Sequence, residues 1–468
     1  MEQEQRLRML LWLVAIAFFM QTLDATIVNT ALPAMAISLG ESPLKMHSVV
    51  VSYALTMAAL IPASGWLADR FGTRRTFMGA IVLFSLGSLA CAMSHSLPQL
   101  VAARVLQGLG GALLLPVGRL AVLRAFPRER FLAAMSFVTV PGLIGPLIGP
   151  TLGGWLVEVA SWHWIFLINL PVGLLGIVLT QRYMLDERQA KVGSFDLIGY
   201  VLLTFSMIAI SLAVDGFSDF RFGHATILLM LMFGLASLAA YWLRAARRPD
   251  ALFSLRLFHI NTFSVGILGN LFARIGSGAM PFLIPLLLQV CLDYTPAQAG
   301  QMLIPVAAAA IFSKRIGPGL IRRFSYRRVL LCNTLLVGAT IASFGLIGAA
   351  QPVWLLLLQL ACFGAVNSLQ FTAMNTITLF DLEGSNASSG NSLLSMVMML
   401  SMSLGVAAAG GLLAAFATQD SGGVQTLDAF HATFVTVGLI TCASSWIFWQ
   451  LAPAAGSASR KQTAVGAD

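Results

Sequence analysis

Asp24 is the only charged residue between Arg8 and Glu41, in an otherwise apolar stretch of the chain. An ionisable side chain inside an apolar segment of membrane-spanning length is costly unless it faces a polar cavity or a partner. Protonation is the easiest way to discharge a carboxylate in a low-dielectric environment. Asp24 is therefore a candidate proton-coupling group.

Three arginines, Arg104, Arg119 and Arg274, also fall within or near long apolar segments. Arg104 could pair with Asp24, with a substrate anion or with backbone carbonyls, and a fixed ion pair without a transport role is the alternative. Arg119 could extend its side chain to the membrane surface. Arg274 has no acid near it in the sequence, so it either lines a cavity or reaches an interface.

Uncharged amides in the same segments could line a substrate cavity. We expect that cavity to contain Gln21, Asn29, Gln107, Arg274, Asn367, Gln370, Asn375 and Asn391. Hydrogen bonding between helices is an equal alternative for these amides.

The composition indicates a polytopic helical membrane protein. The chain has 468 residues, of which 58% are hydrophobic and only 10% are charged. Soluble domains carry about 25% charged residues. The net charge of +9 comes mainly from basic residues that flank apolar segments, which argues against nucleic acid as a partner. The five cysteines and six histidines lack metal-ligand spacing, and no ATP-binding loop or hydrolase motif occurs. We therefore expect neither an enzyme nor a cofactor, and we expect an ion gradient to supply the energy.

Hydrophobic segments predict fourteen transmembrane helices. Their ranges are 10–32, 48–69, 77–94, 98–123, 131–156, 163–184, 196–215, 223–243, 262–290, 297–320, 327–348, 352–380, 388–416 and 429–451. With the first end placed inside, 23 lysines and arginines lie in cytoplasmic segments, whereas only Lys45 and Arg221 lie in external ones. This asymmetry predicts an even number of spans with both termini in the cytoplasm.

A basic loop follows the second predicted helix and is repeated later in the chain. The first copy runs from Gly65 to Arg75, and its last six residues, RFGTRR, match RFSYRR at 323–328 after the tenth helix. Weak parallel repeats of this kind are typical of transporters built from two like bundles. In the first copy an electrostatic latch would use Gly65, Asp69, Arg70, Gly72, Arg74 and Arg75. A simple topology signal is the alternative for the arginines.

The fifth predicted helix carries a glycine stripe. Gly142, Gly145, Gly149 and Gly153 are spaced by three, four and four residues, which places them on one helix face. Such a stripe allows close helix packing, and Pro146 and Pro150, with Gly154 beside them, favour bending. The predicted role is a hinge or seal, with close packing alone as the alternative.

Four of these segments together resemble motifs of the major facilitator superfamily. The loop at 65–75 is similar to its signature loop, 23–33 to the first-helix motif of fourteen-span drug/proton antiporters, 104–111 to its proton-linked arginine motif, and 142–154 to the exporter motif. The resemblance implies two six-helix bundles plus two inserted helices. It also implies that Asp24 and Arg104 take part in proton coupling and that the latch holds an outward-facing state. In the second copy of the loop, Arg322 stands where the first has Asp69.

The combined prediction is an all-α, proton-coupled exporter in the bacterial inner membrane that moves drugs or other amphipathic compounds outward. We expect it to need only lipid, protons and substrate as partners, so a monomer suffices. The apolar segments hold one acid, Asp24, and two arginines that are candidates for the interior, Arg104 and Arg274. Export of an organic anion, such as a carboxylate or its metal chelate, is therefore an alternative. An importer and a non-transporting scaffold rank lower. The predicted divisions are 1–190 for the first bundle, 191–258 for the insert, 259–453 for the second bundle and 454–468 for a cytoplasmic tail.

Overall fold

The computed structural model describes residues 2–126, 128–186, 195–216, 224–248, 251–348, 351–382, 384–417 and 427–452. In these ranges every regular element is a helix, which confirms the all-α prediction. The first half contains α1 (Glu2–Leu39), α2 (His47–Leu60), α3 (Ser64–Phe71), α4 (Thr73–Ala92), α5 (Leu97–Ala125), α6 (Arg128–Val159), α7 (Trp164–Leu167) and α8 (Asn169–Tyr183). The predicted tail at 454–468 lies outside the described residues.

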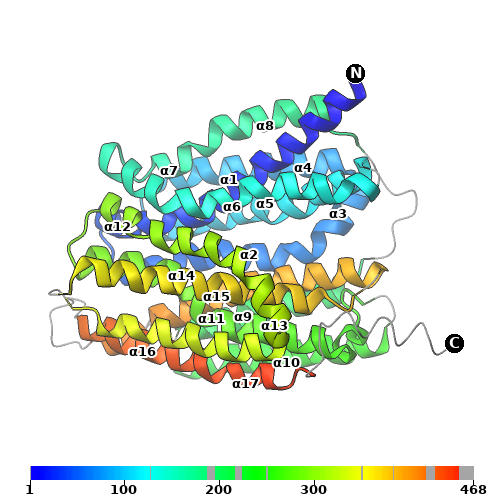
Figure 1. Cartoon of the computed structure of the whole chain (residues 1–468). Helices are drawn as coiled ribbons and strands as arrows, with labels where there is room; N and C mark the ends of the chain where they lie inside the picture. Colours follow the sequence, from blue (N-terminus) through cyan, green and yellow to red (C-terminus); the bar gives the residue numbers. More distant parts are fainter. Residues whose placement is uncertain are drawn as a thin grey trace.

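The rest of the chain continues in the same way (Figure 1). It contains α9 (Leu197–Gly216), α10 (His224–Arg247), α11 (Asn261–Val290), α12 (Pro296–Met302), α13 (Ile304–Ser343), α14 (Val353–Leu379), α15 (Gly384–Phe416), α16 (Leu427–Ala443) and α17 (Ser445–Trp449). Short 3-10 turns lie at Pro43–Met46, Ile61–Ala63, Leu255–His259 and Phe344–Leu346. Helices satisfy their own backbone groups, as an apolar chain in lipid requires.

Twelve helical stretches among the described residues are long and apolar enough to cross a membrane, and they coincide with twelve of the fourteen predicted spans. The other two predicted ranges, 131–156 and 297–320, are helical as well. The first lies within α6, and the second covers α12 and the beginning of α13. That these two also cross the membrane stays a prediction.

The two copies of the basic loop share one backbone turn. Gly72, between α3 and α4, has φ 97° and ψ 147°, and Ser325, at the matching position inside α13, has φ 66° and ψ 156°. Ser325 therefore divides the 40-residue α13 into two helices. This region of the φ/ψ map is almost exclusive to glycine, so Ser325 holds a strained conformation.

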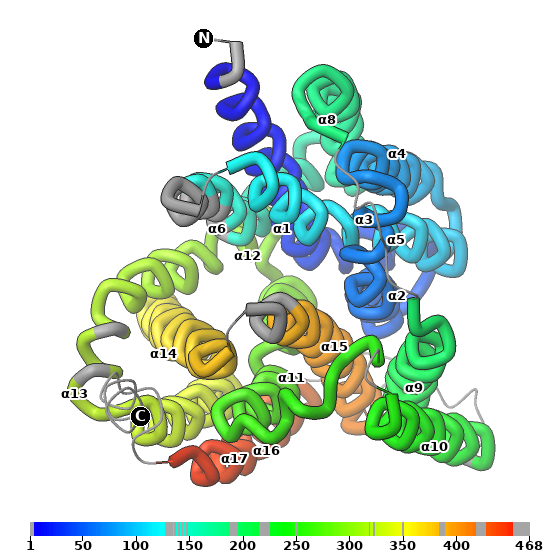
Figure 2. Tube along the Cα trace, turned by 90° about the vertical axis from the view of Figure 1, so that its right-hand side faces the viewer, coloured from blue at the N-terminus to red at the C-terminus, as the bar shows by residue number. Residues whose placement is uncertain are grey.

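The helices form two bundles and a side insert (Figure 2). We call α1–α8 the first bundle, α11–α17 the second bundle, and α9 with α10 the insert. Helix α9 contacts one helix of each bundle, α2 and α15. The Ser211 hydroxyl of α9 lies 3.2 Å from the Ser403 hydroxyl of α15.

Candidate functional site

A buried ion pair lies in the interior of the first bundle. Arg104 of α5 donates from Nη1 to Oδ2 of Asp24 on α1 at 2.8 Å, and the two side chains are 1% and 0% exposed. Both charges are therefore almost completely shielded from solvent. Removing one partner of such a pair leaves an uncompensated charge, which costs about 3–5 kcal/mol.

Two amides complete the coordination of the Asp24 carboxylate. Gln107 Nε2 and Asn169 Nδ2 both donate to Oδ1, at 2.8 and 3.0 Å. Gln107 lies one helical turn after Arg104, and Asn169 begins α8. Both amides also donate to the Ser88 hydroxyl of α4, at 2.8 and 3.3 Å. Four helices thus meet at one carboxylate.

The Arg104 guanidinium is held on its remaining sides by uncharged groups. Nε donates to the Val49 carbonyl at 3.3 Å, and Nη1 also donates to Gln107 Oε1 at 2.6 Å. The guanidinium carbon lies 4.1 Å from the ring centre of Tyr53 and 5.8 Å from that of Phe166. Tyr53 and Phe166 therefore add cation–π contacts to a buried guanidinium.

This arrangement suits an ionised Asp24. The carboxylate accepts three hydrogen bonds from donors that include a guanidinium and two amides. A protonated carboxyl keeps three acceptor positions, but it loses the negative charge that attracts the Arg104 guanidinium, and its new hydrogen needs an acceptor of its own. Protonation at this point would consequently change the contacts among α1, α5 and α8.

The signature-loop residues are connected within the first bundle. Asp69 of α3 forms an ion pair with Arg124 at the end of α5. Arg75 lies 3.5 Å from Asp186, which follows α8, and the Thr73 hydroxyl donates to the Leu185 carbonyl at 3.0 Å. Arg70 is exposed, Arg74 is half-buried and Gly65 has open space around it. The Asp69 ion pair therefore does not reach the second bundle.

The glycine stripe of α6 packs on α1. A Cβ at Gly142 would meet the Phe18 ring, and one at Gly149 would meet the Thr26 hydroxyl. Gly145 approaches the same helix between these contacts, at Thr22, and Gly153 approaches it beyond them, at Ile27 and Thr30. The stripe is therefore an internal contact of the first bundle.

Neighbouring residues of α6 contact the second bundle instead. A Cβ at Gly154 would meet the Pro296 carbonyl, and one at Gly300 of α12 would meet the Pro150 carbonyl. The Thr151 hydroxyl donates to the Gly300 carbonyl at 3.3 Å. Pro146, also on α6, is exposed.

Two further hydrogen bonds between the bundles lie at the same end of the molecule, where α1 and α6 finish. Glu158 Oε1 accepts from the Ala297 amide at 3.0 Å. Gln289 Nε2 donates to the Thr30 carbonyl at 3.0 Å. We call this set of contacts, from α6 and α1 to α12 and α11, the far-end seal.

The second bundle holds Arg274 without an acidic partner among the described residues. Arg274 Nη2 donates to Asn270 Oδ1 at 3.3 Å, and the guanidinium lies 4.5 Å from the Phe371 ring centre. Its Nε finds no hydrogen-bond partner in the described part of the chain, and neither does the amide oxygen of Asn375 on α14. Arg274 is thus a half-buried cation whose Nε is an unused donor among the described residues.

The other predicted cavity residues divide into three groups. Gln21 and Asn29 of α1 are buried, and their amide oxygens find no partner among the described residues. Gln370 is already bonded within the second bundle, to Asn333 and Thr334 at 2.8 and 2.7 Å. Asn367 on α14 and Asn391 on α15 are half-buried.

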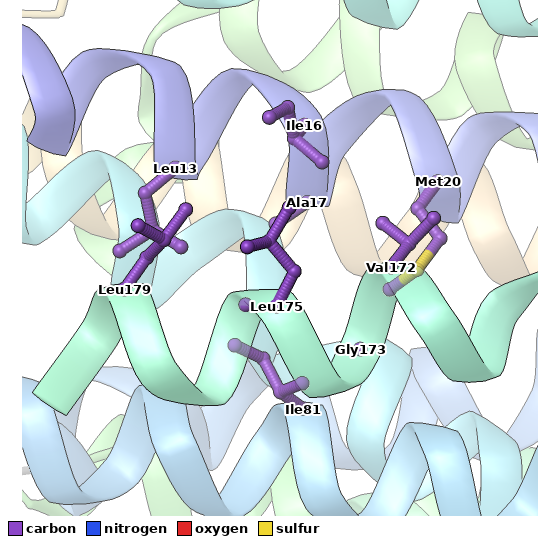
Figure 3. A pocket seen from close by; sticks show the side chains of 10 residues that line it. Leu13, Ile16, Ala17, Met20, Ile81, Val172, Gly173, Leu175 and Leu179 are labelled. Atoms are coloured by element: carbon purple, nitrogen blue, oxygen red, sulfur yellow. The ribbon is translucent and has the colours of Figure 1, made fainter.

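A crevice between α1 and α8 is lined by no polar side chain that could bind a ligand (Figure 3). It has a volume of about 10 Å³ and an entirely apolar lining that includes Leu13, Met20 and Leu179. A space of this size without polar groups is a packing gap.

Asn169 and Ser88 are missing from the sequence prediction. Each is a small polar residue in an apolar helix, where one more hydroxyl or amide is ordinary. The chain order gives no hint that they meet at Asp24. A weak signal was that Asn169 precedes Pro171 at a helix start, but this is also a common capping arrangement.

Comparison with known proteins gives a consistent result. Residues 14–406 match the model of the Major Facilitator Superfamily. "Putative multidrug resistance protein MdtD" of Pectobacterium atrosepticum is 49% identical over 457 residues, covering 97% of each chain. The protein of that name from Serratia proteamaculans is 52% identical, with coverage of 91% of this chain and 88% of the relative.

Among solved structures, a POT family transporter in complex with 5-aminolevulinic acid superposes with a TM-score of 0.70. The sequence identity is 16%, and the match covers 96% of each chain. At this identity the likeness concerns the fold alone.

Proposed function

Because the chain belongs to the major facilitator superfamily and is a membrane transporter of small molecules, we propose that it is a proton-coupled exporter of drugs or other amphipathic compounds. The buried Asp24–Arg104 pair carries the proposal, since a membrane-buried acid with a single cationic partner is suited to exchange a proton. The names of the relatives support multidrug efflux as the physiological role. The same relatives support a bacterial inner membrane.

The proposed cycle uses the donors around Asp24. Ionised Asp24 holds α1, α5 and α8 together through Arg104, Gln107 and Asn169. A proton that reaches Asp24 from outside weakens these bonds and favours one facing state. Release of that proton to the cytoplasm restores them and resets the bundle.

We further propose that the far-end seal closes the external side. The positive-inside asymmetry puts the start of α1 in the cytoplasm, so the contacts of Glu158 with Ala297 lie outside. In this assignment the external side of the structure is closed, and both termini are cytoplasmic. The two bundles, residues 1–190 and 259–453, move around the insert at residues 191–258. A monomer contains every element of this cycle.

The test of coupling is Asp24→Asn in inverted membrane vesicles, with substrate-driven proton flux as the readout. The variant is expected to lose the flux, because it has no titratable group at this position. Asp196→Asn is the matched control: Asp196 pairs with Arg244 at 2.8 Å in the insert, remote from the site. Cargo binding by purified Asp24→Asn shows that it folds. Proton flux that survives in a folded Asp24→Asn variant excludes Asp24 as the coupling group.

Arg274 supports a second candidate, export of an organic anion such as a carboxylate or its metal chelate. Its Nε, which has no hydrogen-bond partner among the described residues, could donate to a carboxylate. Arg274→Ala should then abolish anion export and spare a neutral or cationic drug, whereas Arg274→Lys should restore part of the anion transport. Equal loss for all cargo classes would exclude this candidate.

A further inference from the structure

A groove opens between the insert and the first bundle. Its volume is about 460 Å³, and its walls are formed by α2, α5 and α9. Leu55 of α2, Val105 and Leu109 of α5, and Ile208 and Leu212 of α9 are among its apolar lining residues. We call it the α9 groove. The ion pair at Asp24 has no part in its lining.

The hydroxyl groups of the groove are already occupied. On α2, Ser48, Ser52 and Thr56 donate to the carbonyls of their own turn, at 2.7, 3.2 and 2.7 Å. On α9, the side chains of Tyr200 and Thr204, one helical turn apart, interact with each other. An occupant therefore finds hydrocarbon and satisfied hydroxyls, with no free polar group to hold a polar head. This environment selects an aliphatic chain over a polar cargo.

The dimensions match one leaflet of a bilayer. The lining runs from Ser48 to Leu60 on α2 and from Tyr200 to Leu212 on α9. Twelve residues of helix rise by about 18 Å. The hydrocarbon core of a bilayer is about 30 Å thick, so one leaflet contributes about 15 Å. The groove follows these helices, and both are candidate membrane spans.

The exposed apolar side chains at the groove indicate that it opens toward lipid. Ile208 and Leu212 are 37% and 42% exposed, and Val105 is 39% exposed, on helices that cross the membrane. An apolar space of this size that opens to hydrocarbon is filled by the surrounding medium, because an empty space would forfeit dispersion contacts along its walls.

We propose that the α9 groove binds one acyl chain of a membrane phospholipid. The chain fills the space between α9 and α5 and so links the insert to the first bundle, where α9 otherwise contacts mainly α2. This bound lipid would be a structural ligand of the insert, separate from the transported compound.

The test is native mass spectrometry of the full-length protein, purified from a phosphatidylethanolamine and phosphatidylglycerol mixture and washed in mild detergent. The wild type is expected to retain one phospholipid. Ile208→Trp, which fills the groove, should reduce the retained fraction by at least fivefold. The matched control is Val201→Trp on the same helix, which is 54% exposed and outside the lining, and it should retain the lipid.

Leu109→Phe fills the opposite wall and keeps the test valid if Ile208→Trp does not fold. Equal lipid retention in the wild type and both groove-filling variants would overturn the proposal. A protein dimer in the wild type that only the groove-filling variants lose would also overturn it, since the groove would then be a contact between two copies of the chain.

Discussion

Gly153 and Gly154 are adjacent on α6, yet their missing side chains make room for different partners. A Cβ on Gly153 would press on α1, at the Ile27 carbonyl and the Thr30 hydroxyl, both in the first bundle. A Cβ on Gly154 would press on the Pro296 carbonyl, in the second bundle. Replacing each by alanine therefore separates packing within a bundle from contact between bundles.

The expected magnitude follows from what the new methyl group meets. At Gly154 the nearest atoms all belong to the backbone of Pro296 and Ala297, so no side chain can rotate away. Forcing an extra methyl into a close-packed contact costs about 1–3 kcal/mol. In Gly154→Ala this cost falls on the closed far-end seal alone, so the population with the seal open should rise about 5- to 150-fold.

Hydrogen–deuterium exchange of the α12 peptide, Pro296–Met302, measures this change directly. The peptide includes the Ala297 amide that Glu158 holds in the closed seal. Gly154→Ala should accelerate its exchange by a factor in the range above. Gly153→Ala should lower the overall melting temperature and leave α12 exchange near the wild-type rate. Similar α12 exchange in the two variants would refute the assignment of Gly154 to the contact between bundles.

Two further substitutions test local energetics through thermal unfolding at one fixed scan rate. Ser325→Gly should raise the melting temperature, because it removes about 1–3 kcal/mol of backbone strain at the cost of about 0.5–1 kcal/mol of chain entropy, whereas Gly72→Ser should lower it. A lower melting temperature for Ser325→Gly would contradict the strained turn. Asn169→Ala should destabilise the protein by about 1.5–3 kcal/mol, because the Asp24 carboxylate loses a donor. Thr180→Ala, on the same helix but bonded only to its own turn, should cost less, and equal losses would argue against the bond to Asp24.

Charge made part of the site predictable from the sequence. Asp24 and Arg104 stand out because a charge in an apolar helix costs free energy. They are 80 residues apart in the chain, but few other charged residues in the apolar segments could pair with them. The face of the glycine stripe follows from helical periodicity alone. These features depend on local spacing and on the sign of a charge, both of which are visible in a single chain.

Neutral polar residues were less predictable, because their roles depend on which helices become neighbours. Gln107, predicted to line the cavity, donates to Asp24, and Gln370, predicted likewise, is bonded to Asn333 and Thr334. An amide has donors and acceptors that suit either role. The span pattern located the helices well, but the positive φ at Ser325 was hidden because serine is not a residue that signals such a turn.

The contact between α1 and α6 also limits how the protein can move. The two helices run in the same direction, with Gly142 beside Phe18 and Gly149 beside Thr26. If either helix slid along the other by one residue, a bulky side chain would replace a glycine opposite the neighbouring backbone. The register between α1 and α6 is thus fixed, so the two helices cannot slide along each other during a conformational change. We therefore expect α1 and α6 to move together as one unit during any motion that carries a substrate across.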